Sequence, residues 1–262
     1  MIKFRILIVL VFFSGSLKAQ SFYEPVESFP AFIGLETGIV TMATRLGDID
    51  FIRGGVTNNP YYYTEPYIKV TSTITYFGIR PEWFFRENRL SLSGGLRYTV
   101  CENEIGKEDF NEFFYWKFGE TGINTEYLRV VNAIQHWKYL SIPVEAKFFL
   151  FEPGLVRGYI KFGTELGIRV ATETDITFLQ EGMELYEEEL ATMLSKPHKV
   201  RTVIYSAFGL RIGRANTPSL NFEMMMPYYI ISRERSATID PLIGVGFQIG
   251  IQCPIRYINN HE

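Results

Sequence analysis

The chain of 262 residues carries 26 basic and 29 acidic side chains, which gives a formal net charge of -3. A balance so close to neutrality excludes the strongly basic surface of a nucleic-acid-binding domain, so no nucleic-acid partner is expected. Beyond the N-terminal apolar run, no segment has about 18 consecutive apolar residues, which excludes a helical membrane protein. The remaining length suits a single all-β domain.

The N-terminus has the three parts of a secretory signal peptide. Lys3 and Arg5 supply positive charge, residues 6–13 form an apolar run, and residues 17–19 offer a cleavage site. The run has about half of the ~20 residues that a membrane-spanning helix needs. We therefore expect an exported protein with a signal peptide at 1–19 and a single mature domain at 20–262. A buried N-terminal helix is the alternative interpretation.

The mature chain alternates apolar and polar side chains with a period of two, which predicts β-strands. Eight such segments occur, at residues 32–43, 68–85, 89–101, 139–151, 159–170, 201–213, 219–230 and 243–252. Each has about ten residues or more, which is enough for a tilted transmembrane strand. Strands of a soluble sandwich are usually shorter, with roughly five or six residues.

The connections between these segments alternate between long and short. The long connections are residues 44–67, 102–138, 171–200 and 232–241, and the short ones are 86–88, 152–157 and 214–218. Such alternation is typical of a barrel with tight periplasmic turns and long extracellular loops. The sequence therefore predicts an eight-stranded antiparallel transmembrane up-and-down β-barrel in the outer membrane, with both termini in the periplasm.

Alternation alone does not decide which face of the barrel points outward. A soluble exported barrel of the lipocalin type, with a ligand inside, would have an apolar interior, and this alternative stays open. The polar face carries six positive and five negative groups: Glu36, Arg80, Glu82, Arg97, Glu145, Lys147, Lys161, Glu165, Arg169, Arg211 and Glu223. Nearly balanced charges fit a compact interior, because an unpaired buried charge is costly. We expect this charge network to fill the lumen, with the apolar face towards lipid, which argues against a diffusion pore.

Three segments of these strands carry a resemblance to a known family. They are Arg89-Leu-Ser-Leu-Ser-Gly-Gly-Leu-Arg-Tyr98, Tyr139-Leu-Ser-Ile-Pro-Val-Glu-Ala-Lys147 and Gly158-Tyr-Ile-Lys-Phe-Gly-Thr-Glu-Leu-Gly167. In this order they resemble the PorT-like outer-membrane β-barrel family of Bacteroidota-type Gram-negative bacteria. The resemblance implies an outer-membrane barrel in contact with lipid. For some members it also implies a role around protein secretion, with other outer-membrane or secretion-system proteins as partners.

Residues that could carry catalysis are few. His136 and His198 both precede strands that descend from the extracellular rim, and Glu102, Glu104 and Ser195 lie near that rim by position. No motif spacing links these residues, and no His/Cys cluster has metal-ligand spacing. We therefore expect neither an enzyme nor a cofactor or metal site. An outer-membrane enzyme with its active site at the rim is the alternative.

The second long connection holds a dense group of aromatic side chains: Phe110, Phe113, Phe114, Tyr115, Trp116 and Phe118. Because such a cluster is costly to expose to water, we consider it a candidate partner-binding loop. The equal alternative is that it packs against the other loops as a cap. In the third long connection, apolar residues at helical spacing predict a short amphipathic helix within 182–194, over the barrel mouth.

The two cysteines test the topology. Cys101 ends a strand that ascends towards the outside, whereas Cys253 lies late in the last descending strand. A disulfide needs Cα atoms within ~7 Å. Since the topology places the two residues at opposite ends of the barrel, we expect two free thiols.

Overall fold

The computed structural model describes most of the mature chain. The described ranges are residues 31–46, 51–54, 68–85, 89–106, 113–119, 126–151, 155–194, 196–213, 217–231 and 239–255. The predicted signal peptide at 1–19 lies outside these ranges, and so do Phe110 and Ser195.

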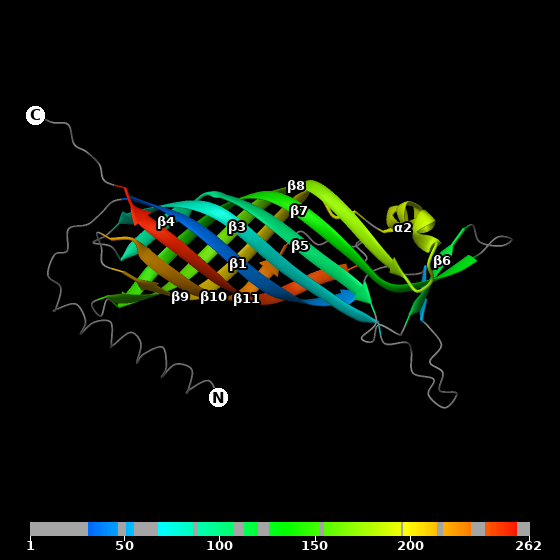
Figure 1. Ribbon diagram of the computed structural model, residues 1–262. Helices are drawn as coiled ribbons and strands as arrows, with labels where there is room; N and C mark the ends of the chain where they lie inside the picture. Colours follow the sequence, from blue (N-terminus) through cyan, green and yellow to red (C-terminus); the bar gives the residue numbers. More distant parts are fainter. Residues whose placement is uncertain are drawn as a thin grey trace, which may run out of the picture.

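The described strands close into an antiparallel ring (Figure 1). The ring contains β1 (Ala31–Leu46), β3 (Lys69–Phe85), β4 (Leu90–Gly94), β5 (Leu96–Gly106), β7 (Glu126–Phe151), β8 (Val156–Phe178), β9 (Val200–Ile212), β10 (Ser219–Ile230) and β11 (Ile239–Pro254). β4 and β5 pair with the same neighbours, β3 and β7, and are two halves of one strand. Pairing of β1 with β11 closes the ring. The eight-stranded antiparallel barrel is therefore confirmed.

The break between β4 and β5 falls on a glycine for a steric reason. A Cβ atom on Gly95 would lie 2.1 Å from the carbonyl oxygen of Ile79 on β3. Only a residue without a side chain tolerates such a close approach of two backbones. The register with β3 and β7 continues on both sides of the break, so the ring stays closed there.

The barrel exterior is apolar, and its interior is polar. Ile142, Phe162 and Phe208 expose 58%, 56% and 56% of their surface, and apolar neighbours around the ring behave alike. Charged side chains on the opposite parity, such as Glu145 and Lys161, are buried. An exterior of this kind is unfavourable in water and favourable in lipid, where a closed ring also satisfies every backbone hydrogen bond. The ring is thus a membrane-spanning barrel with its charges inside.

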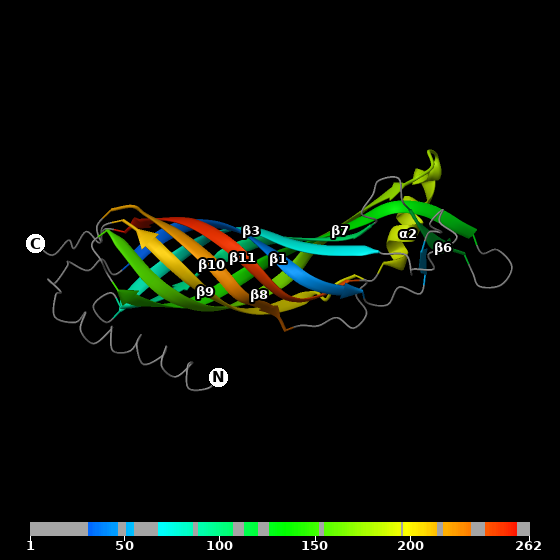
Figure 2. The same ribbon diagram turned by 90° about the horizontal axis from the view of Figure 1, so that it is seen from below.

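Two strands continue far beyond one end of the ring. β7 has 26 residues and β8 has 23, and the two strands stay paired beyond the ring. There the extension of β7 also pairs with β6 (Phe114–Phe118), which in turn pairs with β2 (Ile52–Gly54) (Figure 2). The short helices η2 (Met183–Tyr186) and α2 (Glu187–Met193) pack on this extension. We call β2, β6, residues 126–138 of β7, residues 171–178 of β8, η2 and α2 the platform. None of the helices in the described ranges is long and apolar enough to cross a membrane.

The platform corrects one expectation and agrees with another. The sequence assigned residues 102–138 and 171–200 to loops, but β5, β6, β7 and β8 occupy much of both. The alternation of β7 is hidden because its register shifts between Val130 and Asn132. Buried residues have even numbers up to Val130 and odd numbers from Val131 onwards, as a β-bulge requires. The expected short helix within 182–194 is present as η2 and α2.

Candidate functional sites in the lumen and the platform

The centre of the lumen charge network is the carboxylate of Glu145 on β7. It lies 3.0 Å from the Arg80 guanidinium, 3.2 Å from that of Arg97 and 3.1 Å from Lys161 Nζ. Tyr205 donates its hydroxyl to the same carboxylate at 2.6 Å. All five side chains are buried. One carboxylate thus links strands from opposite sides of the barrel.

On the side of the lumen towards the platform, the network continues through alternating charges. Arg97 lies 2.5 Å from Glu36 and 2.7 Å from Glu165, and Arg201 lies 2.7 Å from Glu165. Glu36 also contacts Arg80 at 2.8 Å. Each buried carboxylate therefore has at least one cation within ion-pair distance, which offsets the cost of burying it.

Towards the end with the short turns, the network consists of two carboxylates and the lysines between them. Lys147 Nζ lies 3.4 Å from Glu223 and 3.5 Å from Glu82. Lys161 forms an ion pair with Glu223, and the Tyr159 hydroxyl donates to Glu223 at 2.7 Å. Here hydroxyl groups share the carboxylates with the lysines.

Ten of the eleven charged residues expected inside the barrel are buried there, and Arg169 is not. Arg169 is half-buried at the rim and donates to the backbone carbonyl of Pro197. Two arginines that were not predicted to belong to the charge network, Arg157 and Arg201, are buried in the lumen. Arg157 had been placed in a turn, but β8 begins at Val156, and Arg201 is the second residue of β9.

These changes alter the charge balance of the lumen. The buried cations of the described ranges are Arg80, Arg97, Lys147, Arg157, Lys161, Arg201 and Arg211, and the buried carboxylates are Glu36, Glu82, Glu145, Glu165 and Glu223. Seven cations thus face five carboxylates, whereas the sequence predicted near balance.

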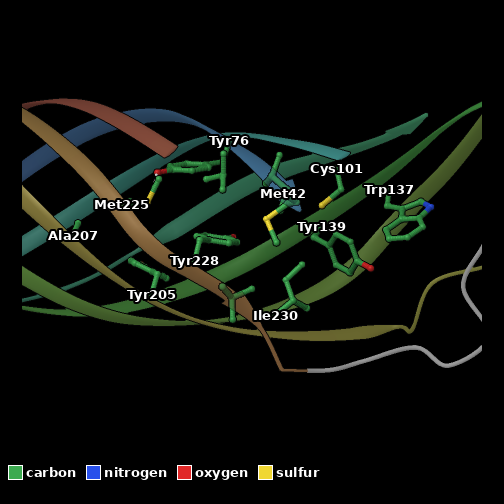
Figure 3. Packing of buried hydrophobic residues seen from close by; sticks show 13 residues of the cluster. Met42, Tyr76, Cys101, Trp137, Tyr139, Tyr205, Ala207, Met225, Tyr228 and Ile230 are labelled. Atoms are coloured by element: carbon green, nitrogen blue, oxygen red, sulfur yellow. Dashed lines mark hydrogen bonds between the residues drawn. The ribbon is translucent and has the colours of Figure 1, made fainter. Parts of the chain in front are cut away.

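An apolar and aromatic layer fills the lumen on the platform side of the charges (Figure 3). Tyr205 and Tyr228 stack with ring centroids 5.7 Å apart. The Tyr76 hydroxyl donates a hydrogen bond to the sulfur of Met225 at 3.4 Å. Tyr76 also donates to Gln248 at 2.7 Å. The layer joins the network directly, because the Arg97 guanidinium lies 4.2 Å from the centre of the Tyr76 ring.

Inward-facing glycines make room for these tyrosines. A Cβ atom would lie 2.4 Å from the ring of Tyr76 at Gly38, 2.5 Å from that of Tyr205 at Gly163, and 2.3 Å from that of Tyr159 at Gly209. Each tyrosine thus lies across a glycine of a neighbouring strand. The ion pairs and rings together occupy the middle of the described lumen, as is usual for eight strands.

The aromatic cluster of the second long connection divides between two environments. Phe114 and Trp116 are fully buried in the platform core with Leu128, Val130 and Leu190. These two residues therefore pack against other parts of the loops, as the cap alternative predicted, and cannot contact a partner directly.

The remaining described members of the cluster are half-buried on the platform surface. Phe113 lies 5.3 Å from Tyr115, and Phe118 lies 5.2 Å from Tyr186. The Arg129 guanidinium lies over the Phe113 ring at 5.1 Å. Among the described members of the cluster, only Phe113, Tyr115 and Phe118 thus remain candidates for a contact surface.

An open cleft, which was not predicted from the sequence, lies between β8 and α2. Its volume is about 590 Å³, and Thr172 and Thr174 of β8 line one side. Its charged lining residues are Asp175, Glu184, Glu187, Glu188 and Lys196. Four carboxylates against one amine make the cleft acidic. Glu187 also accepts the backbone N–H of Ile176 at 2.9 Å, which ties α2 to the strand.

His136 at the rim lies between two carboxylates. His136 has Nδ1 at 3.8 Å from Glu102 and Nε2 at 3.7 Å from Asp175. Glu104 instead accepts a hydrogen bond from Thr71 at 3.2 Å, and His198 is exposed. Within the described ranges, no group of three or more His, Cys, Asp or Glu residues could hold a metal ion.

Both cysteines are free thiols, as the topology predicted. Cys101 is buried beside Arg201, whose guanidinium lies 2.7 Å from its sulfur, and Cys253 is exposed on β11.

Comparisons with known proteins find similarity in architecture alone. No protein-family model matches the chain, and no curated protein matches it. Among solved structures, the outer membrane protein OprG from Pseudomonas aeruginosa shares 10% identity, over 88% of this chain and 98% of OprG, with a TM-score of 0.45. Ail of Yersinia pestis shares 9% identity over 85% and 99%, with a TM-score of 0.28. The transport unit of the autotransporter AIDA-I from Escherichia coli shares 8% over 92% and 97%, with a TM-score of 0.30.

Proposed function

We propose that this chain is an integral outer-membrane protein whose barrel is a closed anchor and whose platform binds a protein partner. The length of β7 carries the proposal. A tilted strand needs about 9–11 residues to cross a membrane, whereas β7 has 26. The other residues build a folded unit with its own buried core around Trp116. A chain that needed only a barrel would not require this second core.

The proposed orientation follows from the two ends of the ring. β1 begins opposite the last residues of β11, with Phe32 paired to Pro254, at the end where the connections are short. Short turns are typical of the periplasmic side and long loops of the outside. We therefore place both ends of the ring-forming chain in the periplasm and the platform outside the cell. The apolar exterior has membrane lipid as its partner.

The acidic cleft is the part of the platform best suited to a partner. Pairing of β8 with β9 reaches only Ile168, so no described strand pairs with residues 171–178 on the side facing α2. Because Ile176 directs its N–H to that side, the N–H of Thr174 points the same way. An extended segment could add to this edge as a further strand. The carboxylates around the edge favour a segment rich in Lys and Arg.

Photo-crosslinking from the strand edge tests this proposal. A photoreactive amino acid at Thr174 should form an adduct with a partner protein in native outer membranes, through a basic segment identified by mass spectrometry. The same probe at Thr164, which lies on the exposed outer face of β8 within the ring, should give no such adduct. Identical products from the two positions, or no protein adduct from Thr174, would contradict the proposal.

Charge reversal provides an independent measure of the same contact. Glu188→Lys places a cation in the cleft and should abolish the adduct from Thr174. Glu126→Lys makes the same change at an exposed position of β7 outside the cleft and should leave it intact. An adduct that survives Glu188→Lys would show that charge does not select the partner.

We further propose that the partner interaction, rather than catalysis, is the activity of the protein. The carboxylates around His136 are exposed, which suits a solvated ion cluster. His136→Ala and His198→Ala should therefore leave the phenotype of the protein unchanged, whereas a rim-located enzyme would lose its activity. A role in protein secretion is a sharper form of the proposal, supported by the PorT-like segments alone. A secretion defect on deletion of the gene would test it.

A further inference from the structure

Two buried arginines of the lumen lie side by side at the end with the short turns. Each of the five buried carboxylates forms an ion pair with Arg80, Arg97, Lys147, Lys161 or Arg201. Arg211 on β9 forms none within the described ranges. Its direct cross-strand neighbour on β8 is another buried arginine, Arg157. Two adjacent buried guanidinium groups repel each other strongly unless an anion lies close to them.

The Arg211 guanidinium is held in place by three contacts that leave its outer fork open. Its central carbon lies 4.3 Å from the Phe32 ring centre and 5.0 Å from that of Phe84. Its Nε donates to the Ser219 hydroxyl at 3.0 Å. Nη1 and Nη2 have no hydrogen-bond partner, although only 1% of the residue is exposed. Such a fixed fork matches two oxygens of one anion.

A second unpartnered group lies on the strand next to that of Arg211. Asn221 on β10 is the direct cross-strand neighbour of Arg211, and both side chains are buried inside the barrel. Side chains of directly opposed residues start about 5 Å apart. Neither the oxygen nor the nitrogen of the Asn221 amide has a hydrogen-bond partner. Its NH2 group can therefore donate to an anion held by Arg211.

The nearby carboxylate of Glu82 is already engaged by other groups. Ser91 donates to it at 2.5 Å, Gln252 also donates to it, and Lys147 lies 3.5 Å away. Glu82 therefore does not supply the acceptor that the open fork of Arg211 needs.

We propose that Arg211, Asn221 and Arg157 form a binding site for a small oxyanion at the short-turn end of the lumen. Phosphate, sulfate or a phosphate monoester has the required charge and oxygen geometry. Binding supplies acceptors for Nη1 and Nη2 of Arg211. The anion is either free in solution or part of a lipid headgroup, because both present the same phosphate oxygens.

Thermal unfolding of the full-length purified barrel tests this site, with the folded fraction read from gel migration without heating. In a non-ionic detergent free of phospholipid, inorganic phosphate should raise the unfolding temperature of the wild-type protein. The rise should be roughly 5–10 °C at a concentration 100-fold above Kd. Sodium chloride at matched ionic strength should not reproduce it. A second arm replaces phosphate with short-chain phosphatidic acid, and a larger rise there would assign the site to a headgroup.

Matched variants decide whether Arg211 is responsible. Arg211→Gln should lose the response to both probes, whereas Arg169→Gln, the same change at the opposite rim, should retain it. If Arg211→Gln does not fold, Arg211→Lys keeps the charge and loses the fork, and it should weaken phosphate binding at least tenfold. A wild-type unfolding temperature that is independent of both probes would overturn the proposal. So would a variant of Arg211 that responds as the wild type does.

Discussion

The lumen and the platform share two strands, β7 and β8, yet their interiors have opposite chemistry. Within the ring, the inward positions of β7 carry Glu145 and Lys147 and the outward positions carry Ile142 and Val144. In the platform, the buried positions of β7 carry apolar residues such as Val130, and charged residues are exposed. The surroundings explain the inversion, because lipid favours an apolar exterior and water favours a polar one. The change in side-chain polarity along β7 thus marks the boundary between the lipid-facing ring and the water-facing platform.

The largest effect is expected where the lumen loses its central carboxylate. Glu145→Gln keeps the side-chain volume but leaves Arg80, Arg97 and Lys161 without their shared partner. Breaking a buried ion pair on one side costs about 3–5 kcal/mol. The urea midpoint for loss of the fast-migrating folded band should therefore fall sharply. Glu102→Gln, at the exposed rim, is the control, and equal midpoints for the two variants would contradict the account.

A comparable loss confined to the platform is expected from Trp116→Ala. This side chain is fully buried in the platform core, and its removal should cost about 3–5 kcal/mol there. Limited proteolysis should cleave the platform rapidly, while the barrel keeps its folded gel migration. Tyr115→Ala, at a half-buried neighbour, should have a smaller effect. Simultaneous unfolding of barrel and platform would show that they are one cooperative unit.

The sequence predicted the strands and the buried charges of the ring better than the strands of the platform. Strict alternation within the ring, as in residues 139–151, located the strands and placed all but one of the expected charges in the lumen. The strands of the platform were not predicted, because the bulge after Val130 shifts the parity of β7 and interrupts its alternation of apolar and polar side chains. Contacts between strands that do not pair, such as the ion pair of Arg80 on β3 with Glu223 on β10, were not predicted either. Alternation states which face a side chain occupies but not which residue it meets across the lumen.

An intermediate effect is expected from filling a glycine position inside the barrel. In Gly163→Ala, the new Cβ would lie 2.5 Å from the Tyr205 ring, so the ring must move away from its contact with Glu145. Overpacking of this kind typically costs about 1–3 kcal/mol. Gly94→Ala is the matched control, since its Cβ would meet only a carbonyl oxygen at 3.6 Å. Thermal midpoints by gel migration should separate the two variants.

The smallest effect concerns the exposed ion pair between Lys138 and Glu173, where the platform joins the ring. The hydrogen bond between them lowers the pKa of Glu173 and raises the pKa of Lys138. The pair therefore stabilises the platform at neutral pH. This stabilisation is lost as pH falls through the lowered pKa of Glu173, and as pH rises through the raised pKa of Lys138.

Tryptophan fluorescence during thermal unfolding measures this dependence, because Trp116 and Trp137 lie in or beside the platform. Glu173→Gln should flatten the pH profile slightly at both ends, as expected for a solvent-screened pair. A profile that is unchanged in the variant would assign the pH dependence to other groups.

A nitroxide scan along β7 tests the inversion between ring and platform most directly. After replacement of Cys101 and Cys253, single spin labels are introduced in turn along the outward face of the strand, in protein reconstituted into lipid. We predict that labels at Ile142 and Val144 are accessible to oxygen dissolved in lipid, and that a label at Arg129 is accessible to a water-soluble relaxation reagent, with the change near Lys138. Labels at Ile142 and Val144 that respond mainly to the water-soluble reagent would contradict the account and favour a soluble barrel.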